Sequence, residues 1–214
     1  MNKENISLHE QINRIQEMSG LNSVGGKHLV VVDIQPEYSS YISFLSDFID
    51  FLNENYDNVS RITFLYNGYD TMGMVNENEY QMWWLENGLD ESVLDVARFY
   101  DKGYAFFRYC MDEGVDVDKI VGLIKLMVRE GVNDSRDLDE EFWDKFISEY
   151  GHEDVRELLE YSDDCVNIPD LMDELSNYKN IILCGGGINQ CLKEVEIALM
   201  SLDKNYSVLT KYTY

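Results

Sequence analysis

The chain has 214 residues, of which 45% are apolar and 13% aromatic, enough for one sizeable hydrophobic core. Acidic residues outnumber basic ones so strongly that the formal net charge is −24, which argues against nucleic-acid and membrane partners. With only two prolines and no apolar run of membrane-spanning length, the chain is expected to be a folded cytoplasmic protein.

Cysteine and histidine are sparse. The cysteines are too few for a disulfide scaffold and include no C-x-x-C pair, so free thiols are expected. The histidines are far apart and lack the spacing of a metal site. We therefore expect neither a metal nor another cofactor. The residues concerned are Cys110, Cys165, Cys184 and Cys191, and His9, His28 and His152.

Residues 1–27 are predicted to form an N-terminal extension. Apolar residues at helical spacing follow Ser7 as far as Met18, and glycines then end the segment. A helix packed on its own domain and a docking peptide are both compatible with this pattern.

Residues 28–214 alternate between short apolar runs and amphipathic stretches. The run at residues 29–34 is typical of a strand that is buried on both faces of a parallel sheet. Further strands are predicted at residues 61–66, 96–100, 180–184 and 208–209. A helix after the first strand would bury a stripe of Tyr38, Tyr41, Ile42, Leu45, Phe48, Ile49 and Leu52.

Between about residues 110 and 170, three amphipathic stripes follow one another without a strand. The alternation elsewhere predicts an α/β fold, with a mostly parallel sheet and helices on both faces in a Rossmann-like three-layer arrangement. In such a sheet, functional sites gather at the carboxyl ends of the strands.

Three reactive side chains follow predicted strands. Asp33 ends the first strand, Lys102 follows the third, and Cys191 begins a helix after a glycine loop. The helix N-terminus and a nearby ammonium would lower the pKa of the thiol and make part of it thiolate. A carboxylate would accept its proton. Taken singly, Asp33 could instead cap a helix, Lys102 lie at the surface and Cys191 pack in the core, whereas Cys184 fits a core position.

The Gly185, Gly186 and Gly187 run leaves backbone N–H groups free to face a bound carbonyl, as in an oxyanion hole beside a nucleophile. The loop and Cys191 are therefore compatible with one acyl-transfer mechanism.

Three separated motifs resemble the isochorismatase-like cysteine hydrolases. The D-x-Q pattern of Asp33 follows an apolar strand, Lys102 precedes an aromatic-rich stretch, and Cys191 lies six residues after Gly185. The resemblance implies an isochorismatase-like α/β fold, in which Cys191 attacks an electrophilic carbon, Asp33 shuttles the proton and Lys102 supports both charges.

The resemblance also implies that backbone groups at Gly187, Ile188 and Cys191 hold the oxyanion, and that the peptide between Gly187 and Ile188 is cis. The chain departs from the family in three ways. Ile188 replaces the usual threonine, the histidine metal site of nicotinamidases has no counterpart, and the separation between Lys102 and Cys191 is unusually long. The extra length is interpreted as a helical insertion at about 110–170, which would form a lid, a dimer surface or a cover for the sheet.

The pocket wall is predicted from residues beside the strand ends and Lys102. Aromatic side chains there would favour a flat or cyclic ligand, although packing in the core explains each of them as well. The candidates are Gln35, Tyr66, Asn67, Trp83, Trp84, Tyr104 and Phe107.

The sequence therefore predicts hydrolysis of a small amide or related C–N bond through a thioester at Cys191. The main alternative is a catalytically silent protein of the same fold that binds other proteins through its acidic surface, which would also permit a DNA-mimicking inhibitor of basic proteins. The glycines do not fit a dinucleotide motif, and Gln35 does not fit an aspartyl phosphotransferase. Association of identical copies is left open.

Overall fold

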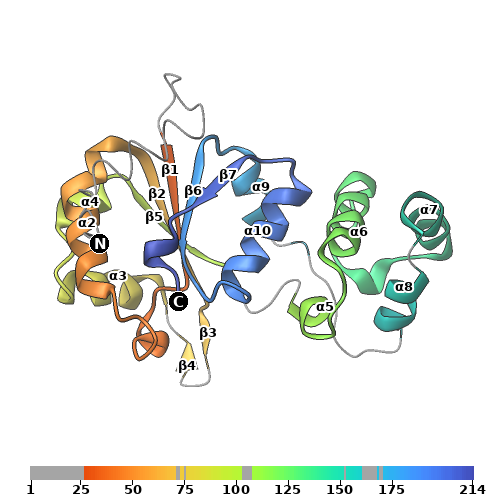
Figure 1. The fold of residues 1–214 in the computed structure, drawn as a ribbon, viewed down its shortest axis with the longest axis horizontal. Helices are drawn as coiled ribbons and strands as arrows, with labels where there is room; N and C mark the ends of the chain where they lie inside the picture. Colours follow the sequence, from red (N-terminus) through yellow and green to blue (C-terminus); the bar gives the residue numbers. More distant parts are fainter. Residues whose placement is uncertain are drawn as a thin grey trace, which may run out of the picture.

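The computed structural model describes residues 27–70, 73–74, 76–102, 108–151, 153–160, 168 and 171–214. Its centre is a parallel sheet with the strand order β5-β2-β1-β6-β7 (Figure 1). In that order the strands are Ala97–Asp101, Val59–Tyr66, Lys27–Val32, Ile181–Gly185 and Tyr206–Val208. A separate antiparallel ribbon pairs β3 (Tyr69–Asp70) with β4 (Gly73–Met74). The predicted parallel α/β fold is confirmed, and the N-terminal helix predicted from Ser7 to Met18 lies outside the described residues.

Strand β1 is the centre of the fold because its side chains are buried on both faces. Val30 and Val32 belong to the apolar cluster on one face, and Leu29 and Val31 to the cluster on the other. Short apolar β-branched runs suit this position, since alternate side chains point to opposite faces of a strand. The uninterrupted valines thus explain why this run forms the middle strand.

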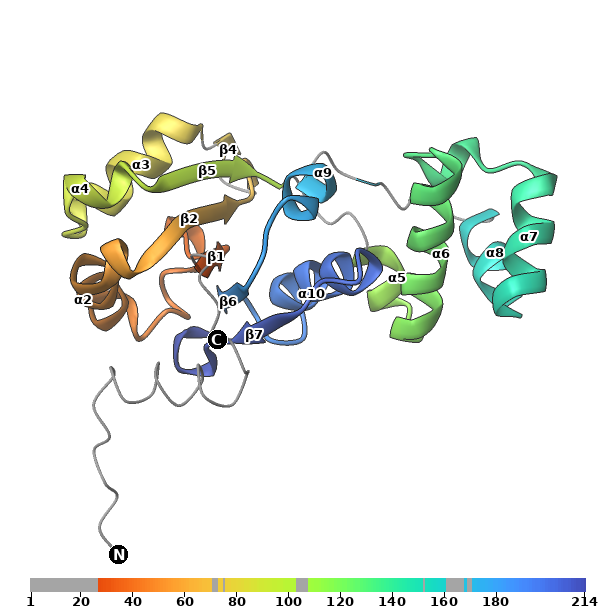
Figure 2. The ribbon, with the colours of Figure 1, turned by 90° about the horizontal axis from the view of Figure 1, so that it is seen from above.

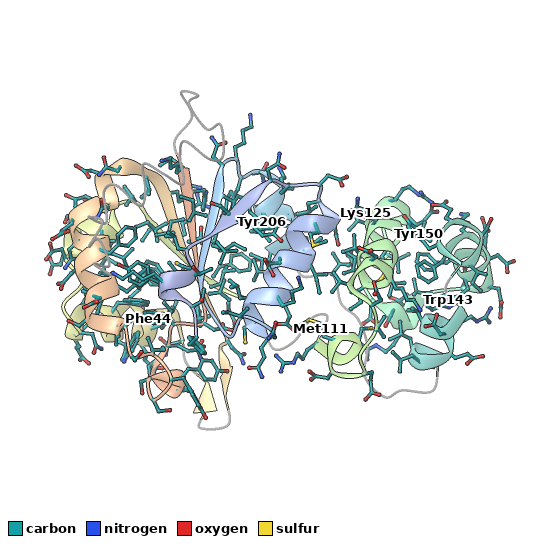
Figure 3. The ribbon with its side chains drawn as sticks, in the orientation of Figure 1. Phe44, Met111, Lys125, Trp143, Tyr150 and Tyr206 are labelled. Atoms are coloured by element: carbon teal, nitrogen blue, oxygen red, sulfur yellow. The ribbon has the colours of Figure 1, made fainter. Side chains whose placement is uncertain are left out.

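Helices cover both faces of the sheet. One face carries α2 (Leu45–Asn55), α3 (Glu77–Glu86), α4 (Glu91–Leu94) and the short 3₁₀ helix η4 (Thr210–Tyr212). On this side Phe44 contacts the ring of Tyr212, at 5.8 Å between centroids (Figure 3). The other face carries α9 (Leu171–Ser176) and α10 (Cys191–Ser201). No helix among the described residues is both long and apolar enough to cross a membrane.

The helix expected directly after β1 begins later than predicted. Pro36–Tyr38 forms only a 3₁₀ turn, η1, and the α-helix begins at Leu45. Tyr41, predicted to lie on the buried stripe, is 68% exposed. The intervening serines explain the difference, because they favour turns over the interior of a helix.

The helical stretch between β5 and β6 forms a layer beyond α10. It contains α5 (Arg108–Asp112), α6 (Val117–Glu130), η3 (Ser135–Asp137), α7 (Glu140–Tyr150) and α8 (Glu153–Glu160). Helix α6 packs on α10, while α7 and α8 lie on the side of α6 away from the sheet (Figures 1 and 2). The stretch was predicted to form a lid, a dimer surface or a cover for the sheet. Helices α7 and α8 do not cover the sheet directly, because α6 and α10 lie between them and the strands (Figure 2).

Glycine is required where α6 and α7 meet. A Cβ atom at Gly122 would lie 2.7 Å from Cδ1 of Tyr150, whose ring lies against α6 (Figure 3). Close approach of the two helices therefore depends on the missing side chain at this position.

A second glycine, Gly185, is fixed by its contact with β1. Its φ of 78° is in the left-handed region, and a Cβ atom there would lie 2.2 Å from the carbonyl oxygen of Val32. We expect Gly185→Ala to lower the free energy of unfolding by more than about 2 kcal/mol, since strain and a backbone clash combine. Urea unfolding measures the change.

Gly114→Ala is the matched control. Gly114 has a φ of 76°, but nothing lies within 4 Å of the position that a Cβ atom would take. We expect this change to cost only the left-handed strain of about 1 to 2 kcal/mol. Equal losses in the two variants would show that the contact with Val32 does not constrain Gly185.

Candidate active site

Asp33 leaves the sheet at the carboxyl end of β1. Its φ of 46° is a left-handed conformation, which aspartate adopts more readily than most residues. Its N–H donates to the Leu65 carbonyl at 2.8 Å, and its own carbonyl accepts from the Tyr214 hydroxyl at 2.9 Å. The turn that ends β1 is thus held by neighbours on both sides, and the residue is only 1% exposed.

Lys102 comes directly after β5 and is buried at 5% exposure. Its N–H donates to the Tyr66 carbonyl at 2.9 Å, which extends the β5 ladder by one residue. Its Nζ lies 3.1 Å from Oδ2 of Asp33 and 3.8 Å from Oε2 of Glu194. The interpretation of Lys102 as a solvated surface lysine is therefore wrong.

The buried ammonium remains charged. Burial alone would lower the pKa of Lys102, but the negative charges of Asp33 and Glu194 outweigh it and raise the pKa above its usual value. A buried cation between two carboxylates is strongly favoured over an isolated one. Lys102 thus supplies a permanent positive charge at this edge of the sheet.

Cys191 is the first residue of α10 and is partly buried. The chain reaches it from β6 through Gly185 and Gly186, which both have positive φ values. A Cβ atom at Gly186 would lie 2.9 Å from the backbone nitrogen of Leu192, so the loop folds tightly against the start of the helix. This compact loop sets the thiol close to the ends of β1 and β5.

The pKa of the Cys191 thiol is raised, whereas the sequence predicted that it would be lowered. Burial, together with the negative charge of Asp33, raises the pKa of Cys191 to about 12, although Lys102 acts in the opposite direction. The prediction treated Asp33 only as a proton acceptor, whereas its negative charge and that of Glu194 also raise the pKa of the thiol. Ionisation of Cys191 therefore requires a group that accepts its proton.

The glycine loop offers fewer free N–H groups than predicted. The N–H of Ile188 donates to the Tyr214 carbonyl at 3.0 Å, and the N–H groups of Gln190 and Leu192 both donate to the Gly187 carbonyl. Among the described residues, the N–H of Cys191 has no acceptor, as expected for the first residue of a helix. The peptide between Gly187 and Ile188 is trans, so the expected cis bond is absent and that prediction is wrong.

These groups open onto a cleft of about 770 Å³ at the carboxyl ends of the strands. The reactive side chains line it together with tyrosines, amides and Arg108. Its lining consists of Asp33, Tyr38, Tyr41, Asn67, Lys102, Arg108, Gly187, Ile188, Asn189, Gln190, Cys191, Glu194 and Tyr214.

Of the predicted pocket residues, Asn67 lines this cleft. Gln35 instead joins the ends of β1 and β2: its Oε1 accepts from the Asn67 N–H at 2.9 Å, and its Nε2 donates to Glu37 at 3.0 Å. Gln35 is buried and is absent from the described cleft wall. Its contacts position Asn67.

The predicted aromatic wall lies elsewhere. Tyr66 packs on Tyr80 at 4.8 Å between ring centroids, and Trp84 is buried in the same cluster. Trp83 lines a different surface hollow together with Pro36 and Met82. The remaining two candidates, Tyr104 and Phe107, lie outside the described residues.

Sequence reasoning missed Glu194 and the tyrosines of the cleft. Glu194 follows Cys191 by three residues, a spacing that places both on one side of a helix, and this was the available signal. Helical periodicity predicts Tyr38 and Tyr41 on a buried stripe and so points away from the cleft. Nothing in the sequence pattern pointed to Tyr214, which reaches Asp33 only through the tertiary fold.

The described residues contain no group of three or more His, Cys, Asp or Glu side chains arranged to hold a metal ion.

No protein-family model, no curated protein and no solved structure matches this chain. The resemblance to the isochorismatase-like hydrolases thus rests on its three motifs.

Removing the buried cation tests the electrostatics of the site. We expect Lys102→Met to lower the free energy of unfolding at pH 8 by about 3 to 5 kcal/mol, because two buried carboxylates lose their counter-ion. The loss should shrink below about pH 7, where protonation of Glu194, whose pKa is raised by burial, relieves part of the penalty. Urea unfolding across this pH range measures both effects.

Lys119→Met is the control, since Lys119 pairs with an exposed Asp154 at 2.6 Å. An exposed pair contributes at most about 1 kcal/mol. If Lys102→Met were as mild at pH 8 as this control, Lys102 would not be the counter-ion of the cluster.

Proposed function

We propose that the protein is a cysteine hydrolase of a small amide or a related C–N bond. The observation that carries the proposal is the convergence of Asp33, Lys102 and Cys191 on one cleft, from three segments far apart in the sequence. A nucleophile, a proton acceptor and a fixed positive charge in one cleft are the components that nucleophilic catalysis requires. The isochorismatase-like family, which the motifs resemble, uses such a triad.

In the proposed reaction, Sγ of Cys191 attacks the substrate carbonyl carbon while its proton passes to Asp33. The C–N bond then breaks, the nitrogen takes the proton from Asp33, and an acyl thioester remains on Cys191. Water attacks the thioester with its proton passing to Asp33, and the carboxylic acid leaves as Cys191 regains a proton. No oxidant, reductant or additional reactant besides water is needed.

The high pKa of the thiol is compatible with this scheme. A neutral thiol beside a carboxylate transfers its proton as it attacks, as in general-base catalysis. Lys102 stabilises the negative charge as it moves from Asp33 to the sulfur. The free N–H of Cys191 is the donor we assign to the oxyanion, whereas the N–H of Ile188 is already bonded to Tyr214.

A cleft of about 770 Å³ suits a small substrate. Tyr38, Tyr41 and Tyr214 supply aromatic surface and hydroxyl groups, which replace the aromatic wall predicted around Trp83. We assign the protein a small-molecule substrate, with no nucleic-acid or membrane partner. The free thiols of Cys110, Cys184 and Cys191 suit the reducing cytoplasm, where we place it.

The competing proposal is a silent protein of the same fold that binds partners through its acidic surface. The neutral thiol and the occupied N–H of Ile188 favour it, because each reduces the reactivity of a resting site. Acylation of Cys191 separates the two proposals, since a silent binding protein has no reason to activate this thiol.

We expect p-nitrophenyl acetate, an activated acyl donor, to release a burst of p-nitrophenol and to acetylate Cys191. Peptide mass spectrometry after an acid quench locates the adduct. Cys110 and Cys184, both fully buried, are internal controls within the same sample. Cys191→Ala should abolish the burst and keep the native fold, because the side chain is small and begins a helix. A burst of equal size in this variant would exclude Cys191 as the nucleophile.

Asp33→Asn tests two roles of Asp33 separately: accepting a proton in the reaction, and raising the pKa of the thiol through its charge. Turnover of the acyl donor should fall by about 10² or more, because the general base is gone. Direct alkylation of Cys191 by iodoacetamide at pH 8 should become faster, since the carboxylate that raises the pKa of the thiol is removed.

Asp50→Asn is the charge-matched control on α2, where Asp50 is exposed. Neither rate should change in this variant. Parallel loss of turnover and alkylation in Asp33→Asn would contradict the assignment of Asp33 as a charge that raises the pKa of the thiol.

A further inference from the structure

Glu194 is a buried carboxylate in the cleft for which the proposed reaction has no role. It is 1% exposed, lies on α10 three residues after Cys191 and lines the cleft. Its Oε2 is 3.8 Å from Nζ of Lys102, and its Oε1 has no hydrogen-bond partner among the described residues. An acid in such a place is costly to keep charged, so its position needs an explanation.

Charged and ionisable groups from four elements face Glu194. They are Lys102 after β5, Asp33 after β1, Arg108 and Asp112 on α5, and the Cys191 thiol on its own helix. Burial raises the pKa of Glu194 to about 7; Lys102 opposes this shift and Asp33 adds to it. Glu194 is thus able to gain and lose a proton near neutral pH.

We propose that Glu194 is a positioning residue that acts through Lys102, and that its protonation state controls how readily Cys191 ionises. The inference rests on the proposed function, because it concerns the same nucleophile. The geometry is that of one cation shared by two carboxylates, 3.1 Å from Asp33 and 3.8 Å from Glu194.

With Glu194 neutral, Lys102 balances Asp33 and stabilises the negative charge that develops on sulfur. With Glu194 ionised, the cleft holds one more negative charge, and Lys102 is shared between two anions. The added charge disfavours the thiolate and the oxyanion alike. Glu194 transfers no proton to the substrate in this scheme, so the reaction balances as before.

The test is the pH dependence of Cys191 modification by methyl methanethiosulfonate in the full chain, measured by peptide mass spectrometry. In the native protein, the rise of the rate with pH should become shallower around pH 7, where Glu194 ionises. Glu194→Gln keeps the shape of the side chain and removes this charge. The rate of Glu194→Gln relative to the native protein should grow about tenfold from acid to alkaline pH, the effect of one pKa unit.

Glu196→Gln is the matched control on the same helix. Glu196 pairs with Lys193 at 3.3 Å and does not line the cleft. Its variant should follow the native profile at every pH. If Glu194→Gln merely damaged the structure, its modification rate would differ from the native rate by the same factor at every pH. An increase of the ratio of the two rates with pH therefore reports the charge of Glu194.

A ratio independent of pH would overturn the role of Glu194 and leave the nucleophile in place. Absence of any modification of Cys191 in all three proteins would overturn both this inference and the proposed function.

A second measurement needs no reactive thiol. The pKa of Glu194 is higher in the folded state than its ordinary value of 4.5. The stabilisation from protonated Glu194 is therefore fully present below pH 4.5 and is lost as the pH rises through about 7. Native protein should therefore lose stability relative to Glu194→Gln across this range in urea unfolding. A constant difference would contradict the inference.

Discussion

The buried ammonium of Lys102 is the contact on which the rest of the site depends. Asp33 and Glu194 lie on different elements, and both carboxylates are almost completely removed from water. Neither would remain in place as an anion without a cation, because the free-energy cost of a buried unpaired charge is several kcal/mol. Lys102 therefore joins the ends of β5 and β1 to the first turn of α10. A cluster of this kind favours one arrangement of the three segments over all others.

The strand order explains why these segments meet. The chain runs from β1 outward to β2 and β5, then returns to β6 on the opposite side of β1. The connections diverge at β1 and β6, which leaves a crevice beyond the carboxyl ends of these strands. Asp33 turns away from the sheet there in a left-handed conformation, and Gly185 does the same on the neighbouring strand. Two neighbouring strands thus end in left-handed backbone at the edge of the sheet where the cleft lies.

The sheet was predictable because short unbroken apolar runs, typical of strands buried on both faces, are visible in the sequence. Asp33, Lys102 and Cys191 could be selected for the same reason, since each follows a recognisable strand. Glu194 could not, because a carboxylate within a helix resembles a solvated residue until packing shows which face is buried. The predicted lowering of the thiol pKa was wrong for a similar reason. The balance of charges around Cys191 depends on distances between segments, which only the tertiary structure sets. The late start of α2 reflects turn-forming serines that helical periodicity does not register.

Helix α10 links this chemistry to the helical layer beyond it. Its first turn carries Cys191 and Glu194, its inner residues belong to the core, and its outer side receives α6 (Figure 2). Packing on both sides leaves little freedom for α10 to shift along the sheet. The layer formed by α5, α6, η3, α7 and α8 thus contributes to the site through the position of one helix. Arg108, at the start of α5, also lines the cleft and is bound by Asp112, so the same layer supplies a cation at its wall. The helical stretch and the ends of the parallel strands consequently both contribute residues to the wall of one cleft.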